Sequence, residues 1–263
     1  MIKIDDTYKP LITGENILRY NVTTESKEFI KYGNWLGAMR EERFFTSPRI
    51  IVRQIVSGKP PRIFAGYTKE PLYFTQIGFS IIPFKEFEVK YILALLNSKL
   101  ITYYHKYQFL DIEKDLFQKI LIANCKQLPI KIISASNQQF FVDKADLMLS
   151  ISNDLLHISN SFLQLLQTKF SIEKLTKKLG NWYELEYGEF LKELDKYNKG
   201  LQPLVTMKLS EQAEWMQYFN EQKQKAQTLK AEIEKTDKEI DKMVYELYGL
   251  SEEEIAIVEN LTN

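Results

Sequence analysis

The second half of this chain keeps a strict 4,3 spacing of apolar residues, and this pattern restricts its fold more than any other feature. A first stretch holds the spacing for eight positions and a later one for eleven. Because a 4,3 repeat places its members on one stripe of a helix, each stretch predicts a long helix with a coiled-coil seam. The positions are Phe141, Ala145, Met148, Ser152, Leu155, Ser159, Phe162 and Leu166, and then Trp215, Phe219, Gln222, Ala226, Leu229, Ile233, Thr236, Ile240, Met243, Leu247 and Leu250.

The segment 171–210 separates the two stretches and is long enough to let the second helix return antiparallel to the first. Its sequence does not indicate a role of its own. Polar residues at seam positions weaken a coiled coil, and this seam contains four of them, Ser152, Ser159, Gln222 and Thr236. Two interpretations stay open. The helices form an intramolecular hairpin with a solvated acidic face, or they dock another domain or chain, with a homodimer as one form of such docking.

The first half predicts a different architecture. Alternating β-branched residues and turn signals indicate four short strands, followed by an amphipathic helix and two further strands. We therefore expect an α+β fold: a small mixed β-sheet domain with packed helices over residues 1–134, followed by a long antiparallel coiled-coil pair over residues 135–263. The expected strands are 50–56, 62–68, 72–76, 79–82, 117–122 and 130–133, and the expected helix is 89–104.

The two halves differ in charge although the whole chain is neutral. Residues 1–134 hold 20 Lys and Arg against 13 Asp and Glu, a net charge of +7, whereas residues 135–263 hold 15 against 22, a net charge of −7. Such asymmetry indicates that the first half faces a polyanion.

The basic residues are concentrated between Arg43 and Lys69, where six cations and no acidic residue alternate with aromatic side chains. Guanidinium groups suit phosphate oxygens and guanine edges, and aromatic rings can stack on bases, so this stretch favours nucleic acid. A solvated basic face is the alternative, and for Arg49 a framework role is almost as favoured as DNA contact. The candidate DNA-contacting residues are Arg40, Arg43, Arg49, Arg53, Lys59, Arg62, Tyr67 and Lys69.

Residues for catalysis or metal binding are scarce. The only histidines, His105 and His157, and the only cysteine, Cys125, are far apart in the sequence, which gives little support to a zinc site or a Cys-His nucleophile. Carboxylate-x-Lys triplets near Lys196 and Lys235 fit ordinary charge pairs on a solvated helix surface better than a nuclease site. We predict no catalytic and no metal-binding residue. A single cysteine and the lack of a signal peptide or membrane span fit a cytoplasmic protein.

Four ordered motifs and the chain's end carry a family resemblance. Lys9-Pro10-Leu11-Ile12-Thr13-Gly14-Glu15-Asn16-Ile17 with Arg19-Tyr20, Pro48-Arg49-Ile50-Ile51-Val52-Arg53-Gln54, Tyr91 to Leu100, Gln127-Leu128-Pro129-Ile130, and the ending from Ile240 to Ile255 are similar to the TaqI-like C-terminal specificity domain. That domain occurs in adenine-specific DNA methyltransferases and in the single-chain restriction-modification enzymes called type IIG.

The resemblance implies a target recognition domain that binds double-stranded DNA and is not an enzyme by itself. S-adenosylmethionine, and Mg²⁺ where a nuclease is present, would belong to methyltransferase and nuclease domains outside this chain, on the same or a partner chain, so we expect no cofactor here. Among the motif residues it implies framework roles: Gly14 for a turn, Arg53 and Gln54 for strand anchoring or phosphate contact, and Asn97 and Lys99 for holding a helix on the sheet. Whether the chain is a fragment or stands alone stays open.

Three functions are compatible with these features. The leading hypothesis is a DNA sequence-recognition module that positions duplex DNA for an adenine methyltransferase. A coiled-coil protein-interaction module without DNA binding is the main alternative. RNA binding, with preference for single strands, is the third.

Overall fold

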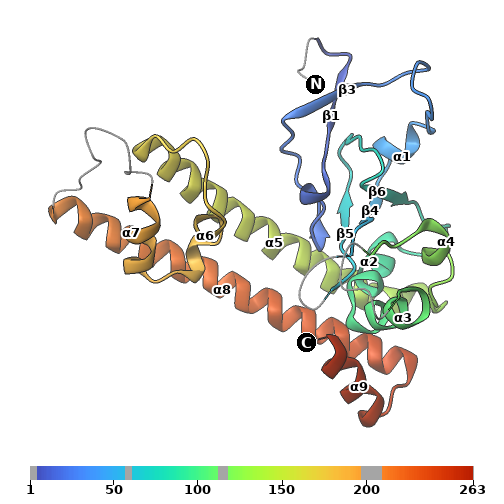
Figure 1. Ribbon diagram of the computed structural model, residues 1–263. Coiled ribbons are helices and arrows are strands. Elements are labelled where there is room, and N and C mark those ends of the chain that lie inside the picture. Colours follow the sequence, from blue (N-terminus) through green and yellow to red (C-terminus); the bar gives the residue numbers. More distant parts are fainter. Residues whose placement is uncertain (1–4, 57–60, 112–117, 197–208, 263) are drawn as a thin grey trace. The chain divides into compact units, whose positions relative to one another are not determined.

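The computed structural model describes residues 5–56, 61–111, 118–196 and 209–262 (Figure 1). The chain divides into two compact units, which are described separately. Unit 1 comprises Met1–Leu149 with Thr236–Asn263, and unit 2 comprises Ser150–Lys235. The sequence predicts a boundary at residue 134, whereas unit 1 also takes in the first part of one long helix and the last part of the other.

Unit 1 contains two small sheets. Strands β1 (Tyr8–Leu11) and β3 (Glu28–Lys31) pair antiparallel. The larger sheet has the order β2-β5-β4-β6, in which β2 runs parallel to β5 and the other pairs are antiparallel. The remaining strands are β2 (Tyr20–Asn21), β4 (Arg49–Arg53), β5 (Ala65–Thr68) and β6 (Gly78–Ile81). This mixed sheet confirms the predicted α+β class.

The helices of unit 1 are short except for the two that continue into unit 2. They are the 3-10 turn η1 (Gly14–Asn16) and the helices α1 (Arg43–Thr46), α2 (Val89–Asn97), α3 (Lys99–Phe109), α4 (Ile122–Cys125) and α9 (Glu252–Thr262), with parts of α5 (Ala135–Phe170) and α8 (Leu209–Tyr248).

The larger sheet is covered on both faces. Ile50 of β4 lies directly opposite Tyr67 of β5, and directly opposite residues of an antiparallel pair share a face. Lys90 of α2 lies over the Tyr67 ring, so α2 covers this face. Ile51 points to the other face and packs in a buried cluster with Ile12, Ile17, Val22 and Leu72.

The side chain of Asn97 holds the end of α2 on the sheet. Its amide nitrogen donates to the Ala65 carbonyl oxygen at 2.8 Å, and its amide oxygen accepts from the Ala65 backbone N–H at 3.3 Å. This confirms the role expected for Asn97. Gly66 beside it allows the parallel strand β2 to approach, because a methyl group there would collide with the Asn21 carbonyl.

Three predicted strands are wrong within the described residues. Residues 72–76 form only an isolated bridge, between Leu11 and Tyr73. Of 117–122, residue 117 lies outside the described residues, Lys119 forms an isolated bridge with Ile55, and Ile122 begins α4. Residues 130–133 form no strand. Apolar runs this short pair only where a partner strand is available. Pro71 lies just before residues 72–76 and Pro129 just before residues 130–133, and a proline has no backbone N–H to donate.

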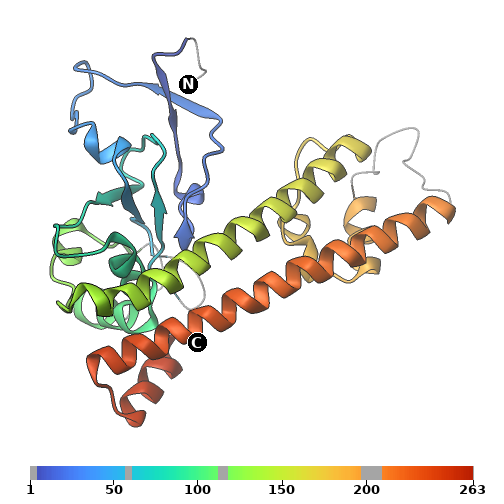
Figure 2. The same cartoon turned by 180° about the vertical axis from the view of Figure 1, so that it is seen from behind.

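Unit 2 is helical. The 171–196 part of the segment between the long helices forms α6 (Lys177–Gly180), the 3-10 turn η2 (Trp182–Glu184) and α7 (Tyr187–Asp195). Figures 1 and 2 show α6 and α7 lying against the parts of α5 and α8 that belong to this unit. The rest of this segment, 197–208, lies outside the described residues.

Within unit 2, α5 and α8 run antiparallel, as predicted. Phe170 near the end of α5 contacts Trp215 near the start of α8, with ring centroids 5.4 Å apart, whereas Ile158, earlier in α5, lines the same groove as Leu229, later in α8. Phe162 stacks on Trp182 with ring centroids 3.8 Å apart, and Leu179, Phe190 and Leu194 join the same buried cluster.

The segment between the long helices therefore supplies the core of unit 2, a role that its sequence did not indicate. Pairing of the two helices through a continuous coiled-coil seam stays a prediction. Among the described residues, none of the helices has the length and apolar character that crossing a membrane requires.

Candidate nucleic-acid interface

Three of the candidate DNA-contacting residues are exposed cations on the segments that flank β4 and β5. Arg40 precedes α1, Arg43 begins it, and Lys69 follows β5. Arg43 lies over the Phe44 ring and pairs with Glu41 at 2.9 Å. Because both partners of that pair are well exposed, the pair is weak and a phosphate can replace the carboxylate. Within the described residues, no ion pair holds Arg40 or Lys69.

Arg53 ends β4 and is half-buried. Its guanidinium lies over the Phe64 ring, 5.6 Å from the centroid. Gly14 lies beside it, since a methyl group added there would be in ordinary contact with Arg53 Nε at 3.5 Å. No carboxylate of the described part of the chain pairs with Arg53. The side chain is therefore available to an anionic ligand while its orientation is restricted.

Tyr67 lies on the opposite face of the sheet from Arg53. Arg53 is two residues beyond Ile51 and shares its face, whereas Tyr67 lies opposite Ile50 and under Lys90, which pairs with Asp146. Burial raises the pKa of Tyr67, and Asp146 adds to that effect while Lys90 opposes it. The structure does not bring Tyr67 and Arg53 together into one surface.

Arg49 is fully buried although it was a candidate contact. Its guanidinium donates to the carbonyl oxygens of Ser47 at 2.8 Å, Glu70 at 3.1 Å and Leu72 at 3.0 Å. Burial lowers the pKa of Arg49 to about 10. These bonds join the start of β4 to the loop after β5, which favours the framework alternative for this residue.

Arg62 belongs to a buried polar cluster with Arg19 and Asp237. Arg62 donates to Asp237 at 3.2 Å, and Arg19 donates to the same carboxylate at 2.9 and 2.5 Å. Both arginines also donate to the Asn97 carbonyl oxygen at 2.9 Å. Burial alone would raise the pKa of Asp237, but the two guanidinium groups outweigh burial and lower it. Arg62 therefore fastens α8 to the sheet domain, and a DNA contact by this residue would require breaking the cluster.

Lys99 extends this attachment to the last two helices, not to the sheet as expected. Its backbone N–H donates to Asp241 at 2.8 Å, and its side chain pairs with Glu259 of α9. Tyr245 donates to the same Glu259 carboxylate at 2.7 Å. Of the remaining candidates, Lys59 lies outside the described residues. DNA contact by the candidate residues stays a prediction.

The described part of the chain lacks a side-chain cluster suited to a metal ion. No group of three or more His, Cys, Asp or Glu side chains there could hold a metal ion. His105 is buried, and burial lowers its pKa to about 4; burial raises the pKa of Cys125 to about 11. Glu193 is buried and pairs with Lys196 at 2.5 Å, so this carboxylate is not on a solvated surface as expected.

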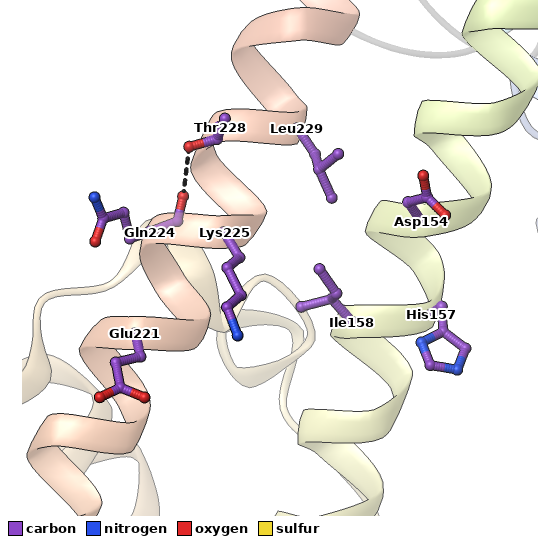
Figure 3. A pocket seen from close by; sticks show the side chains of 8 residues that line it. All are labelled: Asp154, His157, Ile158, Glu221, Gln224, Lys225, Thr228 and Leu229. Carbon is purple, nitrogen blue, oxygen red and sulfur yellow. Dashed lines mark hydrogen bonds between the residues drawn. The ribbon is translucent and has the colours of Figure 1, made fainter.

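Unit 2 contains an open groove of about 690 Å³ between α5 and α8 (Figure 3). Ile158 and Leu229 face each other across it, and its rims carry charges of both signs, from Asp154, Glu221 and Lys225. His157 lines the groove from α5. The mixed lining does not indicate a particular ligand.

Sequence reasoning missed Trp35, an exposed aromatic residue between two glycines. It lies in the segment between β3 and α1, with the Lys31 ammonium over its ring. The available signal was a Gly-x-Trp-x-Gly run without acidic neighbours, which is characteristic of a turn that presents a side chain to solvent.

The structure thus combines a small α+β unit that carries exposed cations with a helical unit. Residues 9–130 match the family described as the TaqI-like C-terminal specificity domain. This match confirms the resemblance carried by the four motifs between Lys9 and Ile130, whereas the ending from Ile240 to Ile255 lies outside it. Residues 134–244 match a second family, described as a domain of unknown function (DUF8810).

One relative has a name that includes an activity. It is the "Putative type II restriction enzyme and methyltransferase RM.MjaORFECS2P" of Methanocaldococcus jannaschii, which is 28 % identical to this chain over 142 residues. The match covers 51 % of this chain but only 12 % of that protein. The chain therefore spans only a small part of the length of that relative.

Proposed function

We propose that this chain is the DNA sequence-recognition module of a restriction-modification adenine methyltransferase, and that it binds duplex DNA and positions it for a catalytic domain outside this chain. The observation that carries the proposal is the specificity domain over residues 9–130. The name of the M. jannaschii relative, which includes both a restriction enzyme and a methyltransferase, supports the same system.

The contrast between buried and exposed arginines fits this function. Arg49 and Arg62 are used inside the domain, where they fix the sheet, its loop and α8. Arg40, Arg43 and Lys69 remain exposed, and Arg53 remains half-exposed, so these four candidate residues can contact phosphates. If four phosphates are neutralised, log affinity falls against log salt with a slope of about −3 to −4.

A salt titration with substitutions tests the proposal. We would measure fluorescence anisotropy of a labelled mixed-sequence duplex with the full chain, Arg53→Ala, Lys69→Ala and the control Lys192→Ala on α7. Each of the first two substitutions should weaken binding and reduce the magnitude of the slope by about 1, because one phosphate contact is lost. The control should match the unaltered chain. Absence of binding at low salt would refute the proposal.

The reaction chemistry would come from the catalytic domain. We expect S-adenosylmethionine, and Mg²⁺ where a nuclease is present, to bind that domain and not this chain. The protein-interaction alternative makes a different prediction for light scattering: a stable dimer whose mass and stability do not respond to duplex DNA.

A further inference from the structure

The segment 33–39, which we call the Trp35 loop, projects an indole ring into solvent. It connects β3 to the residues just before α1. Trp35 is 64 % exposed, whereas Trp182 is fully buried and Trp215 is half-buried. Met39 at the end of the loop is exposed as well. An exposed indole leaves a large apolar surface in water, which suits a residue that contacts a partner.

The indole is held in place rather than free to rotate. Its Nε1–H donates to the Lys31 carbonyl oxygen at 3.0 Å, and the Lys31 ammonium lies 5.6 Å from the ring centroid. The ring also lies directly on Gly33, where a methyl group would collide with three of its carbon atoms. A ring with a fixed orientation loses little conformational entropy when it binds.

The base of the loop is attached to the core. The Tyr32 hydroxyl donates to the Arg40 carbonyl oxygen and so closes the loop across its two ends. The Tyr32 ring packs on Phe45 and Tyr73, with centroids 5.5 and 5.0 Å away, and both of those residues are buried. The Trp35 loop is therefore a braced projection of the domain.

The charges around the loop favour a polyanion as its partner over a basic or neutral protein surface. Residues 29–40 include Lys31 and Arg40 and no acidic residue. The next two acids are engaged, because Glu41 pairs with Arg43 and Glu42 accepts from the Tyr73 hydroxyl at 2.8 Å. Cations beside a fixed aromatic ring are the combination with which proteins hold a nucleic acid backbone and pack on its bases.

We propose that the Trp35 loop enters a groove of duplex DNA, where Trp35 packs against a base step while Lys31 and Arg40 contact the flanking phosphates. This inference rests on the proposed function and assigns a specificity-determining residue to it. Trp35 reads the bases or their deformability, and the cations fix the position of the loop without reading sequence.

The test compares two alterations of the ring with a matched control in the full-length chain. Trp35→Ala removes the ring, and Gly33→Ala displaces it while leaving it present. Phe140→Ala is the control, because Phe140 on α5 of the same unit is 63 % exposed and thus comparable to Trp35. Anisotropy titrations against the same duplex should show a loss of about tenfold for Trp35→Ala, a smaller loss for Gly33→Ala and no change for Phe140→Ala.

Two further readouts distinguish base packing from phosphate contact. Trp35→Ala should leave the salt slope unchanged, whereas Lys31→Ala should reduce its magnitude by about 1. Adding duplex should quench the indole emission of the unaltered chain, and this quenching should vanish in Trp35→Phe, because the other two tryptophans lie in unit 2.

The outcomes separate the two proposals. If the unaltered chain binds duplex but Trp35→Ala binds within about twofold of it, the Trp35 loop is not a base contact, and the proposed function survives. The loop would then be a candidate contact for a protein partner. If the unaltered chain binds no duplex at all, both proposals fail. Thermal melting should show equal stability for Trp35→Ala and the unaltered chain, since the ring is outside the core.

Discussion

The single guanidinium group of Arg49 donates hydrogen bonds to three backbone carbonyl oxygens and so joins separate segments of the chain. Its three accepting carbonyls come from both sides of the sheet's central hairpin, at Ser47 and at Glu70 and Leu72. A buried carbonyl without a donor costs about as much as a lost hydrogen bond, so the arginine compensates for burying irregular backbone. Arg53, four residues later on the same strand, is the last residue of β4 and is half-exposed.

Arg49→Ala should therefore destabilise the fold rather than remove a DNA contact. We expect the free energy of unfolding to fall by about 2–4 kcal/mol, because the buried carbonyls lose their donor and a cavity forms. Urea denaturation followed by circular dichroism measures this change. Arg40→Ala, an exposed control, should change stability by less than about 0.5 kcal/mol. Equal effects of the two substitutions would contradict the framework role.

Two aspartates one helical turn apart on α8 have opposite pKa shifts. Arg19 and Arg62 lower the pKa of Asp237, whereas burial first and then the charge of Asp237 raise the pKa of Asp241 to about 6. The folded protein therefore retains a proton on Asp241 that the unfolded chain, with a pKa near 3.8, releases. Between about pH 4 and 6 the unfolded chain binds fewer protons, so stability falls as the pH rises.

Asp241→Asn should remove this pH-dependent loss of stability. Asparagine cannot titrate but can still accept from the Lys99 backbone N–H, so the variant should gain stability relative to the unaltered chain between pH 4.5 and 6.5. The gain should be on the order of 2 kcal/mol. Asp237 contributes in the opposite sense, but its contribution is lost as the pH falls from its ordinary pKa of 3.8 to its lowered pKa, which is below this window. Urea midpoints at four pH values would measure the difference, and a constant difference would count against the raised pKa.

At the scale of elements, the corner between α2 and α3 comes from one buried serine. Ser98 is extended, its hydroxyl accepts from the Ile101 N–H at 3.3 Å, and the same hydroxyl donates to the Leu95 carbonyl at 2.7 Å. One side chain thus ends α2 and begins α3. The apolar stripe continues across this corner, so the sequence pattern alone predicts one helix from 89 to 104, and a serine within such a stripe does not distinguish a cap from a buried helical position.

Ser98→Ala should cost about 1 kcal/mol of stability, because α3 loses its N-cap. The matched control is Ser150→Ala, an exposed serine within α5, which should be neutral or slightly stabilising since alanine is the better helix former. Thermal melts of both variants measure the contrast. A Ser98→Ala variant as stable as the control would show that the corner is set by packing and not by the cap.

Elements with a local pattern were predictable, and contacts that join distant elements were not. Every position of the two 4,3 stretches with a described side chain is buried or half-buried, because helix periodicity alone decides which face is apolar. The role of Asn97 in holding a helix on the sheet could be predicted from its motif. The pairing of Arg62 with Asp237 spans 175 residues and follows no spacing, so the basic stretch was read as one surface although two of its arginines are internal.

At the scale of the whole molecule, unit 1 is built from two separated pieces of sequence. Asp237, Asp241 and Glu259 from the chain's last part complete the charge and hydrogen-bond partners of Arg19, Arg62 and Lys99. From α5, Phe141 packs on Tyr91 with ring centroids 5.2 Å apart, and Gln138 accepts from the Glu88 N–H at 2.7 Å. Residues 1–134 therefore lack part of the contacts that hold unit 1 together.

A fragment of residues 1–134 should consequently fail to fold stably. Removing one partner of a buried ion pair costs about 3–5 kcal/mol, a large share of the 5–15 kcal/mol that stabilises a typical domain, and the apolar face of α2 would also lose its cover. The fragment should show little protection of β4 and β5 amides in hydrogen exchange.

The matched variant replaces Ser150–Lys235 with a linker of about six glycine and serine residues, a usual length for joining antiparallel helices. Lys144 of α5 and Glu239 of α8 pair at 2.6 Å, so the two helices are adjacent near the cut and a short linker can connect them. This variant keeps every contact of unit 1 and should melt cooperatively with protected β4 and β5 amides. If it unfolds while 1–134 folds, unit 1 is not the folding unit and the domain does end near residue 134.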